Sequence, residues 1–155
     1  ATKIRTGQDL ITIGEQFQQK ANWFRIFQAY GENEKQERFL PSLISTLAKG
    51  EVFRINSPDT VLDWVSSKIV AEAIFYSIEK GINGAVNIGT GVGTSTLELA
   101  HEVCEVLNFD KSLLEASDGI QNQTRCVASL DSKLFRAKWK PSNTLRCTIK
   151  SLASK

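Results

Sequence analysis

The spacing of apolar residues predicts helices that alternate with strands. In residues 4–19 apolar side chains recur at near-helical spacing, which predicts an amphipathic helix with a wide apolar stripe. Residues 23–27 (WFRIF) are aromatic and β-branched and predict a strand. Residues 39–47, with Pro41 in the first turn, predict a second helix that ends at Gly50.

The rest of the chain continues this alternation. The further predicted elements are strands at 52–55, 61–65, 84–89 and 126–128, helices from Ser66 or Ser67 to Gly81 and from Ser95 to Leu107, a short helix at 131–137 and a last helix after Pro141. Ser95 and Glu98 have the spacing of a capping box. A polar loop is expected at 118–123. Alternation of this kind is typical of an α/β or α+β fold.

The segment Gly89-Thr90-Gly91-Val92-Gly93 lies between a predicted strand and a predicted helix, as in a dinucleotide-binding fingerprint. That fingerprint requires a further glycine where Thr94 stands. Asp110, 21 residues after Gly89, falls at the end of a predicted helix and not at the end of a strand. We therefore favour a structural turn before a capped helix, and a free-standing dinucleotide binder is the least favoured function.

Composition excludes several functional classes. No run approaches the roughly 18 apolar residues that span a bilayer, and no secretory signal core is visible, so neither a membrane partner nor export is expected. Residues 111–155 carry 9 basic and 3 acidic side chains. These basic residues are dispersed among apolar ones, which favours a solvated face over a nucleic-acid site. The absence of any Met suggests a piece of a longer chain.

Cysteine and histidine give no catalytic or metal site. Cys104, Cys126 and Cys147 are odd in number and include no C-x-x-C pair, which fits neither a disulfide framework nor a zinc site and favours a reducing, cytoplasmic location. The single histidine, His101, lies three residues before Cys104 among glutamates that predict an exposed helix side. A catalytic Cys–His dyad is therefore not favoured.

Six short segments resemble motifs that occur in the same order in one enzyme family. They are 25–31 (RIFQAYG; R-x-F-N-x-Y-G-P), 38–44 (RFLPSLI; R-L-I-P-x-x-I) with KGE at 49–51, 62–65 (LDWV; R-D-F/W-V) with VAEAI at 70–74, 87–91 (NIGTG), 131–134 (DSKL) and 139–141 (WKP; G-W-x-P). The chain thereby resembles the C-terminal portion of extended short-chain dehydrogenases/reductases, the NAD(P)-dependent nucleotide-sugar epimerase/dehydratase family. The resemblance covers almost the whole chain.

The resemblance implies an α/β fold in two parts. Residues 1–31 would be the last helix and strand of the Rossmann-type cofactor domain, and residues 32–155 the small mixed α/β substrate-binding domain. Lys3 would be the lysine of the family's Y-x-x-x-K motif, whose tyrosine would lie two residues before Ala1. In that role Lys3 lowers the tyrosine pKa and hydrogen bonds the nicotinamide ribose, so it is the expected catalytic and cofactor-binding residue.

The resemblance also implies which residues bind a nucleoside diphosphate-sugar. The expected substrate-binding residues are Gln28 at the family's asparagine position, Arg38, Phe39 and Leu40 around the nucleotide, Phe53 against the base, and Arg125 on the diphosphate. The alternative for Phe39, Leu40 and Phe53 is the hydrophobic core, and for the two arginines a solvated surface.

Three residues depart from the family pattern. Leu62 replaces an arginine that contacts phosphate, Ile69 replaces the aspartate of V-x-D-V-A, and Glu32 replaces the proline after Tyr30-Gly31. The loss of one diphosphate arginine removes a charge-assisted contact worth about 1.5–3 kcal/mol. Substrate is therefore expected to be held differently or more weakly than in the family.

The resulting hypothesis is the substrate-binding part of an NAD(P)-dependent epimerase, dehydratase or 4-ketoreductase. NAD or NADP would bind the parent protein and not this chain alone, which is expected to be inactive. A homodimeric parent is implied, because the helix that contains Lys3 commonly lies in the family's dimer interface. The alternative is a non-catalytic sugar-nucleotide-binding or assembly module derived from the same family, which Leu62 and Ile69 suggest.

Overall fold

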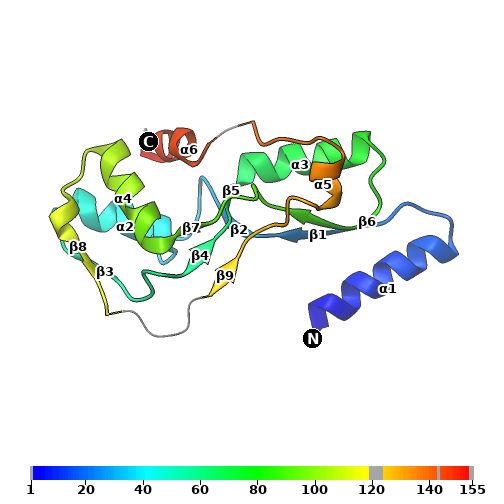
Figure 1. The fold of residues 1–155 in the computed structure, drawn as a ribbon, viewed down its shortest axis with the longest axis horizontal. Helices are drawn as coiled ribbons and strands as arrows, with labels where there is room; N and C mark the ends of the chain where they lie inside the picture. The colour runs from blue at the N-terminus through cyan, green and yellow to red at the C-terminus, as the bar shows by residue number, and fades with distance from the viewer. Residues whose placement is uncertain (1, 119–123, 143, 154–155) are drawn as a thin grey trace.

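The computed structural model describes residues 2–118, 124–142 and 144–153 (Figure 1). Its helices are α1 (Thr2–Gln16), α2 (Phe39–Ala48), α3 (Ser67–Glu79), α4 (Thr96–Leu107), α5 (Lys133–Arg136) and α6 (Leu145–Ala153), with a 3-10 turn at Lys111–Leu113. Its strands are β1 (Asn22–Ile26), β2 (Gln28–Tyr30), β3 (Phe53–Ile55), β4 (Val61–Leu62), β5 (Trp64–Ser66), β6 (Gly84–Ile88), β7 (Thr94–Ser95), β8 (Leu114–Ala116) and β9 (Arg125–Cys126).

The strands form small sheets that are mostly parallel. β1 pairs with β6, β2 with β5 and β3 with β8, each in parallel. β4 lies between antiparallel β7 and parallel β9. Figure 1 shows α3 and α5 on one side of β1 and β6, and α1 on the other. Parallel strands with helices on both faces confirm the predicted α/β class.

Two groups of buried side chains form the core. The first joins α2, α4, α6, β2, β3 and β5, and its members are Tyr30, Leu40, Leu43, Leu47, Ile55, Trp64, Leu99, Ala100, Val103, Cys104 and Ile149. The second lies between α3, β6 and α5, and its members are Val65, Ile69, Ala73, Val86, Ile88, Leu134 and Trp139. Residues 63–66 run between the two groups, so this segment links both halves of the molecule.

The helix caps form where the sequence predicts them. The Ser95 hydroxyl oxygen accepts a hydrogen bond from the Glu98 N–H at 3.1 Å, and the Glu98 carboxylate accepts one from the Ser95 N–H at 2.7 Å. The predicted capping box of α4 is therefore confirmed. Ser66 caps α3 by accepting from the Ile69 N–H at 3.3 Å, and the helix is followed by Gly81 with φ of 62°.

Several details were not predicted. Strands β2, β7 and β8 have only two or three residues each, which is too short for an alternating pattern to be recognised. His101 is exposed as expected, whereas Cys104 is only 1% exposed and belongs to the core. Residues 119–123 of the predicted polar loop lie outside the described residues. None of the helices in the described ranges has the length and hydrophobicity needed to cross a membrane.

Candidate functional site

Asp63 lies at the junction of β4 and β5 and hydrogen bonds the backbone of two other strands. Its N–H donates to the Cys126 carbonyl in β9 at 3.0 Å, and its carbonyl accepts from the Gln28 N–H in β2 at 3.1 Å. Arg125 is the neighbour of Cys126. The backbones of β2 and β9, which carry Gln28 and Arg125 and are far apart in the sequence, thus meet at Asp63.

The Asp63 carboxylate is fully buried and accepts four hydrogen bonds. Oδ1 accepts from the Thr90 N–H at 2.8 Å and from the Thr90 hydroxyl at 2.7 Å. Oδ2 accepts from the Gly91 N–H at 2.8 Å and from the Ala128 N–H at 3.1 Å. A buried carboxylate requires such partners, because desolvation without them is very costly.

The glycine-rich turn packs tightly against this carboxylate and its surroundings. A Cβ at Gly89 would lie 2.5 Å from Oδ2 of Asp63, and one at Gly93 would lie 2.8 Å from Val61 and from Val127. Protein atoms therefore occupy the space beside these glycines. This packing supports a structural turn and does not fit a pyrophosphate cradle.

Phe39, Phe53 and Trp64 form an aromatic cluster beside β4. The ring centroids of Phe39 and Phe53 are 5.7 Å apart, and those of Phe39 and Trp64 are 5.8 Å apart. Phe39 and Phe53 are half-buried and pack on the edge of the core, so part of each ring faces outward. Leu40 is only 1% exposed, which places its side chain in the core.

The charged candidates differ in their surroundings. Arg38 is exposed and its Nε donates to Glu34 at 2.9 Å, an exposed ion pair of small energetic value. Arg125 is exposed on β9, and a Cβ at Gly93 would lie 3.3 Å from its Nη2 atom. The Arg125 guanidinium therefore lies over the glycine-rich turn. Lys3 is exposed in the first turn of α1, which packs mainly against β1 and β6.

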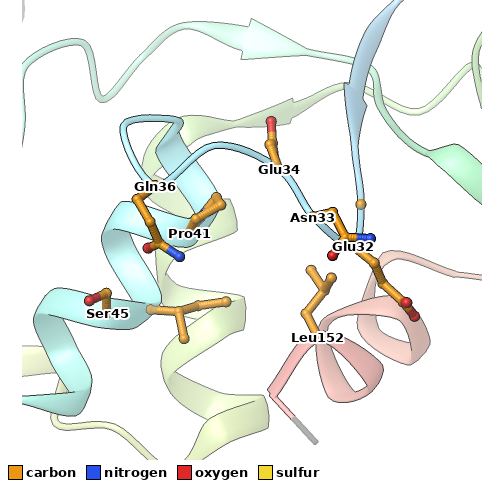
Figure 2. Close-up of a pocket in the computed structure, with 9 residues that line it drawn as sticks. Glu32, Asn33, Glu34, Gln36, Pro41, Ser45 and Leu152 are labelled. Atoms are coloured by element: carbon orange, nitrogen blue, oxygen red, sulfur yellow. The ribbon is translucent and has the colours of Figure 1, made fainter. Parts of the chain in front are cut away.

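The hollows of the described surface do not coincide with these residues. A pocket of about 390 Å³ lies under residues 31–36, between α2 and the C-terminal end of α6 (Figure 2). Figure 2 shows Gln36 and Pro41 on one side of it and Leu152 on the other. A second hollow of about 640 Å³ lies between the glycine-rich turn and the start of α6. None of the predicted site residues lines either one.

The two tyrosines of the sequence both have structural partners. Tyr30 is 3% exposed, and burial raises its pKa, although a hydrogen bond with Thr148 opposes the rise. Tyr76 and Lys80 have Y-x-x-x-K spacing, which the sequence analysis did not consider. The Tyr76 hydroxyl donates to the Ala137 carbonyl, and the Lys80 ammonium lies 5.7 Å from the Tyr76 ring centroid. Both tyrosine hydroxyls therefore have hydrogen-bond partners within the fold.

Thiol and metal chemistry find no support in the described parts of the chain. Burial raises the pKa of the Cys104 thiol, which makes it a poor nucleophile. Within those parts, no three His, Cys, Asp or Glu side chains lie close enough to bind a metal ion. The predicted site residues offer a guanidinium, an amide and an aromatic surface.

The sequence model of the NAD dependent epimerase/dehydratase family matches residues 1–89, which is more than half of the chain. The chain belongs to this family. A comparison with curated proteins finds no match.

Solved structures of the family share this fold. The UDP-glucose 4-epimerase of Thermotoga maritima, solved with UDP-glucose, superposes with a TM-score of 0.82 at 23% identity, over 97% of this chain and 50% of that one. The dTDP-glucose 4,6-dehydratase of Bacillus anthracis, solved with NAD, superposes with a TM-score of 0.78 at 16% identity, over 95% of this chain and 47% of that one. The GDP-mannoheptose C4 reductase of Campylobacter jejuni, solved with NADP, superposes with a TM-score of 0.81 at 18% identity, over 97% of this chain and 54% of that one. The chain thus spans about half the length of the structures it matches.

Proposed function

We propose that this chain forms the nucleoside diphosphate-sugar-binding part of an NAD(P)-dependent epimerase, dehydratase or 4-ketoreductase. The observation that carries the proposal is that Asp63 hydrogen bonds the backbone of Gln28 and of Cys126, the neighbour of Arg125, so that the backbones of β2 and β9 meet at this residue. Residues 1–31 would belong to the cofactor domain and residues 32–155 to the substrate domain. Neighbours solved with UDP-glucose, NAD and NADP support the choice of ligands.

Each candidate has a role that suits its chemistry. The exposed Arg125 guanidinium offers a planar fork of donors that matches a diphosphate. The half-buried rings of Phe39 and Phe53 offer a surface for a base, and the Gln28 amide can donate to or accept from a sugar hydroxyl. Arg38 adds a second cation at the start of α2, and Leu40 would contribute only its backbone.

The described residues do not by themselves fit a dinucleotide. The space beside the glycines of the glycine-rich turn is occupied by protein atoms. Lys3, at the start of α1, is the one cofactor-binding residue predicted for this chain. NAD(P) would serve the whole protein as hydride carrier, with Lys3 at the edge of its site. Because both tyrosines have structural partners, we expect no turnover by the 155-residue chain alone.

Calorimetric titration tests the substrate-binding role. The full chain is titrated with UDP, dTDP and GDP and with the matching nucleosides. We expect at least one diphosphate to bind more tightly than its nucleoside. Arg125→Ala should weaken that diphosphate about 10-fold or more, because a hydrogen bond to a charged group is worth about 1.5–3 kcal/mol.

Lys140→Ala is the matched control, since it removes one exposed positive charge outside the candidate site. It should leave the affinity for the diphosphate unchanged. The proposal is wrong if no diphosphate binds more tightly than its nucleoside, or if both variants have the same effect.

Two departures favour a second candidate, a non-catalytic binding or assembly module. Leu62 stands in β4 where the family carries a phosphate-binding arginine, and Ile69 is 2% exposed in the core. A whole protein that binds a nucleotide-sugar without converting it, in the presence of NAD or NADP, would support the module. A tyrosine two residues before Ala1 together with sugar conversion would support the enzyme.

A further inference from the structure

Strand β9 is so short that its position depends on the neighbouring strand. It has two residues, and the backbone on either side of Arg125 is held by residues 61 and 63. The Val61 N–H donates to the Thr124 carbonyl at 2.9 Å, and the Asp63 N–H donates to the Cys126 carbonyl at 3.0 Å. The position of Arg125 therefore depends on the segment that contains Asp63.

The Asp63 side chain extends this hold beyond the strand. Oδ2 accepts from the Ala128 N–H at 3.1 Å, three residues after Arg125, and also from the Gly91 N–H at 2.8 Å. The Thr90 hydroxyl completes the set at 2.7 Å from Oδ1. One carboxylate thus joins the chain that follows Arg125 to the glycine-rich turn beneath its guanidinium.

The partners of the Asp63 carboxylate are all N–H or O–H donors. Among the ion pairs of residues 2–118, 124–142 and 144–153, none includes Asp63. A buried carboxylate held only by dipoles acts as a directional anchor, because each of its lone pairs faces a fixed donor. If one donor is lost, the remaining donors and the segments that carry them can shift.

We propose that Asp63 is the positioning residue for Arg125, and that its carboxylate fixes where the guanidinium lies over the glycine-rich turn, in the place where a diphosphate would bind it. The proposal rests on the proposed function, since Arg125 is taken there as the diphosphate ligand. Asp63 itself does not touch substrate, because it is fully buried. Its effect reaches the ligand through the backbone of β9 and the glycine-rich turn.

A double-mutant cycle tests this role. The measured quantity is the ratio of the nucleoside Kd to the diphosphate Kd, for whichever of UDP, dTDP and GDP binds the wild-type chain most tightly. Thr90→Val removes the hydroxyl, which donates to Asp63 Oδ1 and also accepts from the Val92 N–H at 3.1 Å, with little change in shape, and Thr90→Ser restores it. We expect Thr90→Val to lower the ratio about threefold to tenfold, which falls within the range measured for coupled neighbours, and Thr90→Ser to keep it.

The cycle is closed with Arg125→Ala. In that background Thr90→Val should have no further effect on the ratio, because the guanidinium that it displaces is gone. A general structural defect would instead weaken the nucleoside and the diphosphate alike, and would leave the ratio unchanged with or without Arg125. Asp63→Asn should act in the same direction as Thr90→Val, and thermal unfolding shows which variants fold. If Asp63→Asn does not fold, the comparison of Thr90→Val with Thr90→Ser decides whether Asp63 positions Arg125.

The outcomes separate this proposal from the proposed function. If the wild-type chain binds no diphosphate more tightly than its nucleoside, the proposed function fails and the positioning role fails with it. If Arg125→Ala lowers the ratio of the nucleoside Kd to the diphosphate Kd but Thr90→Val does not, only the positioning role is wrong. If Thr90→Ser loses as much as Thr90→Val, the hydroxyl contact is not responsible and the role is also overturned.

Discussion

Lys138 has the left-handed backbone conformation that usually belongs to glycine. Its φ is 65°, and it directly follows Ala137, the residue that caps the C-terminal end of α5. The Lys138 N–H donates to the Phe135 carbonyl at 2.9 Å and the Trp139 N–H to the Leu134 carbonyl at 3.0 Å, which closes the helix. The family motif G-W-x-P has glycine at this position. A side chain there costs about 1–2 kcal/mol of conformational energy.

The first prediction follows from this strain. Lys138→Gly should raise the free energy of unfolding by about 0.5–1 kcal/mol, because the relief of strain exceeds the entropy cost of glycine. Urea denaturation measures the change. Lys140→Gly is the matched control, since Lys140 is not among the left-handed residues, and it should be neutral or destabilising. Equal effects of the two substitutions would contradict the explanation.

At the scale of elements, the start of α4 combines a capping box with a pH-sensitive carboxylate. The pKa of Glu98 is lowered, chiefly by the hydrogen bond that its carboxylate accepts from the Ser95 backbone N–H. A lowered pKa in the folded state means that the ionised carboxylate favours folding. This contribution is present above the ordinary Glu pKa and is lost as the pH falls through and below it.

The second prediction concerns this cap. Ser95→Ala should lower the free energy of unfolding by about 1 kcal/mol at neutral pH. Glu98→Gln should also destabilise the chain at neutral pH, and its difference from wild type should shrink toward pH 3. Urea midpoints at about pH 7 and pH 3 measure both effects. A difference that is constant with pH would show that the Glu98 charge does not matter.

At the scale of the whole molecule, α1 exposes most of its apolar stripe. Only Gly7 and Gly14 are buried in this helix, while Ile4, Leu10 and Ile13 are 63%, 41% and 51% exposed, and Phe17, directly after the helix, is 71% exposed. Beneath it, β1 and β6 form a parallel pair of only two strands. Such sheets are normally buried on both faces and continue into more strands. This face therefore favours association with further protein.

The third prediction is that the isolated chain self-associates through α1. Sedimentation velocity of the wild-type chain should show species larger than 17.2 kDa. Ile13→Glu combined with Phe17→Glu should shift the population toward monomer. Phe75→Glu is the control, because Phe75 is 76% exposed on α3, away from α1. A monomeric wild-type chain, or an equal shift with Phe75→Glu, would contradict the prediction.

Local patterns predicted more of the fold than of the site. The α4 capping box depends on residues three apart, so it is visible in the sequence. Gln28 and Arg125 were singled out by resemblance, and nothing in their local sequence showed that the strands that carry them meet at Asp63. Asp63 was itself quoted only as part of a motif. Its partners Thr90 and Ala128 are 27 and 65 residues away, beyond the reach of any periodicity.

The sequence by itself determined the helices, the longer strands, the caps and the family, because each of these is recorded in residues close together or in a fixed order of motifs. Only the tertiary structure decided that Asp63 is a buried anchor, that the glycine-rich turn packs against it, and that Leu40 and Cys104 belong to the core. These properties depend on desolvation and on contacts between distant segments. Such contacts exist only once the chain has folded.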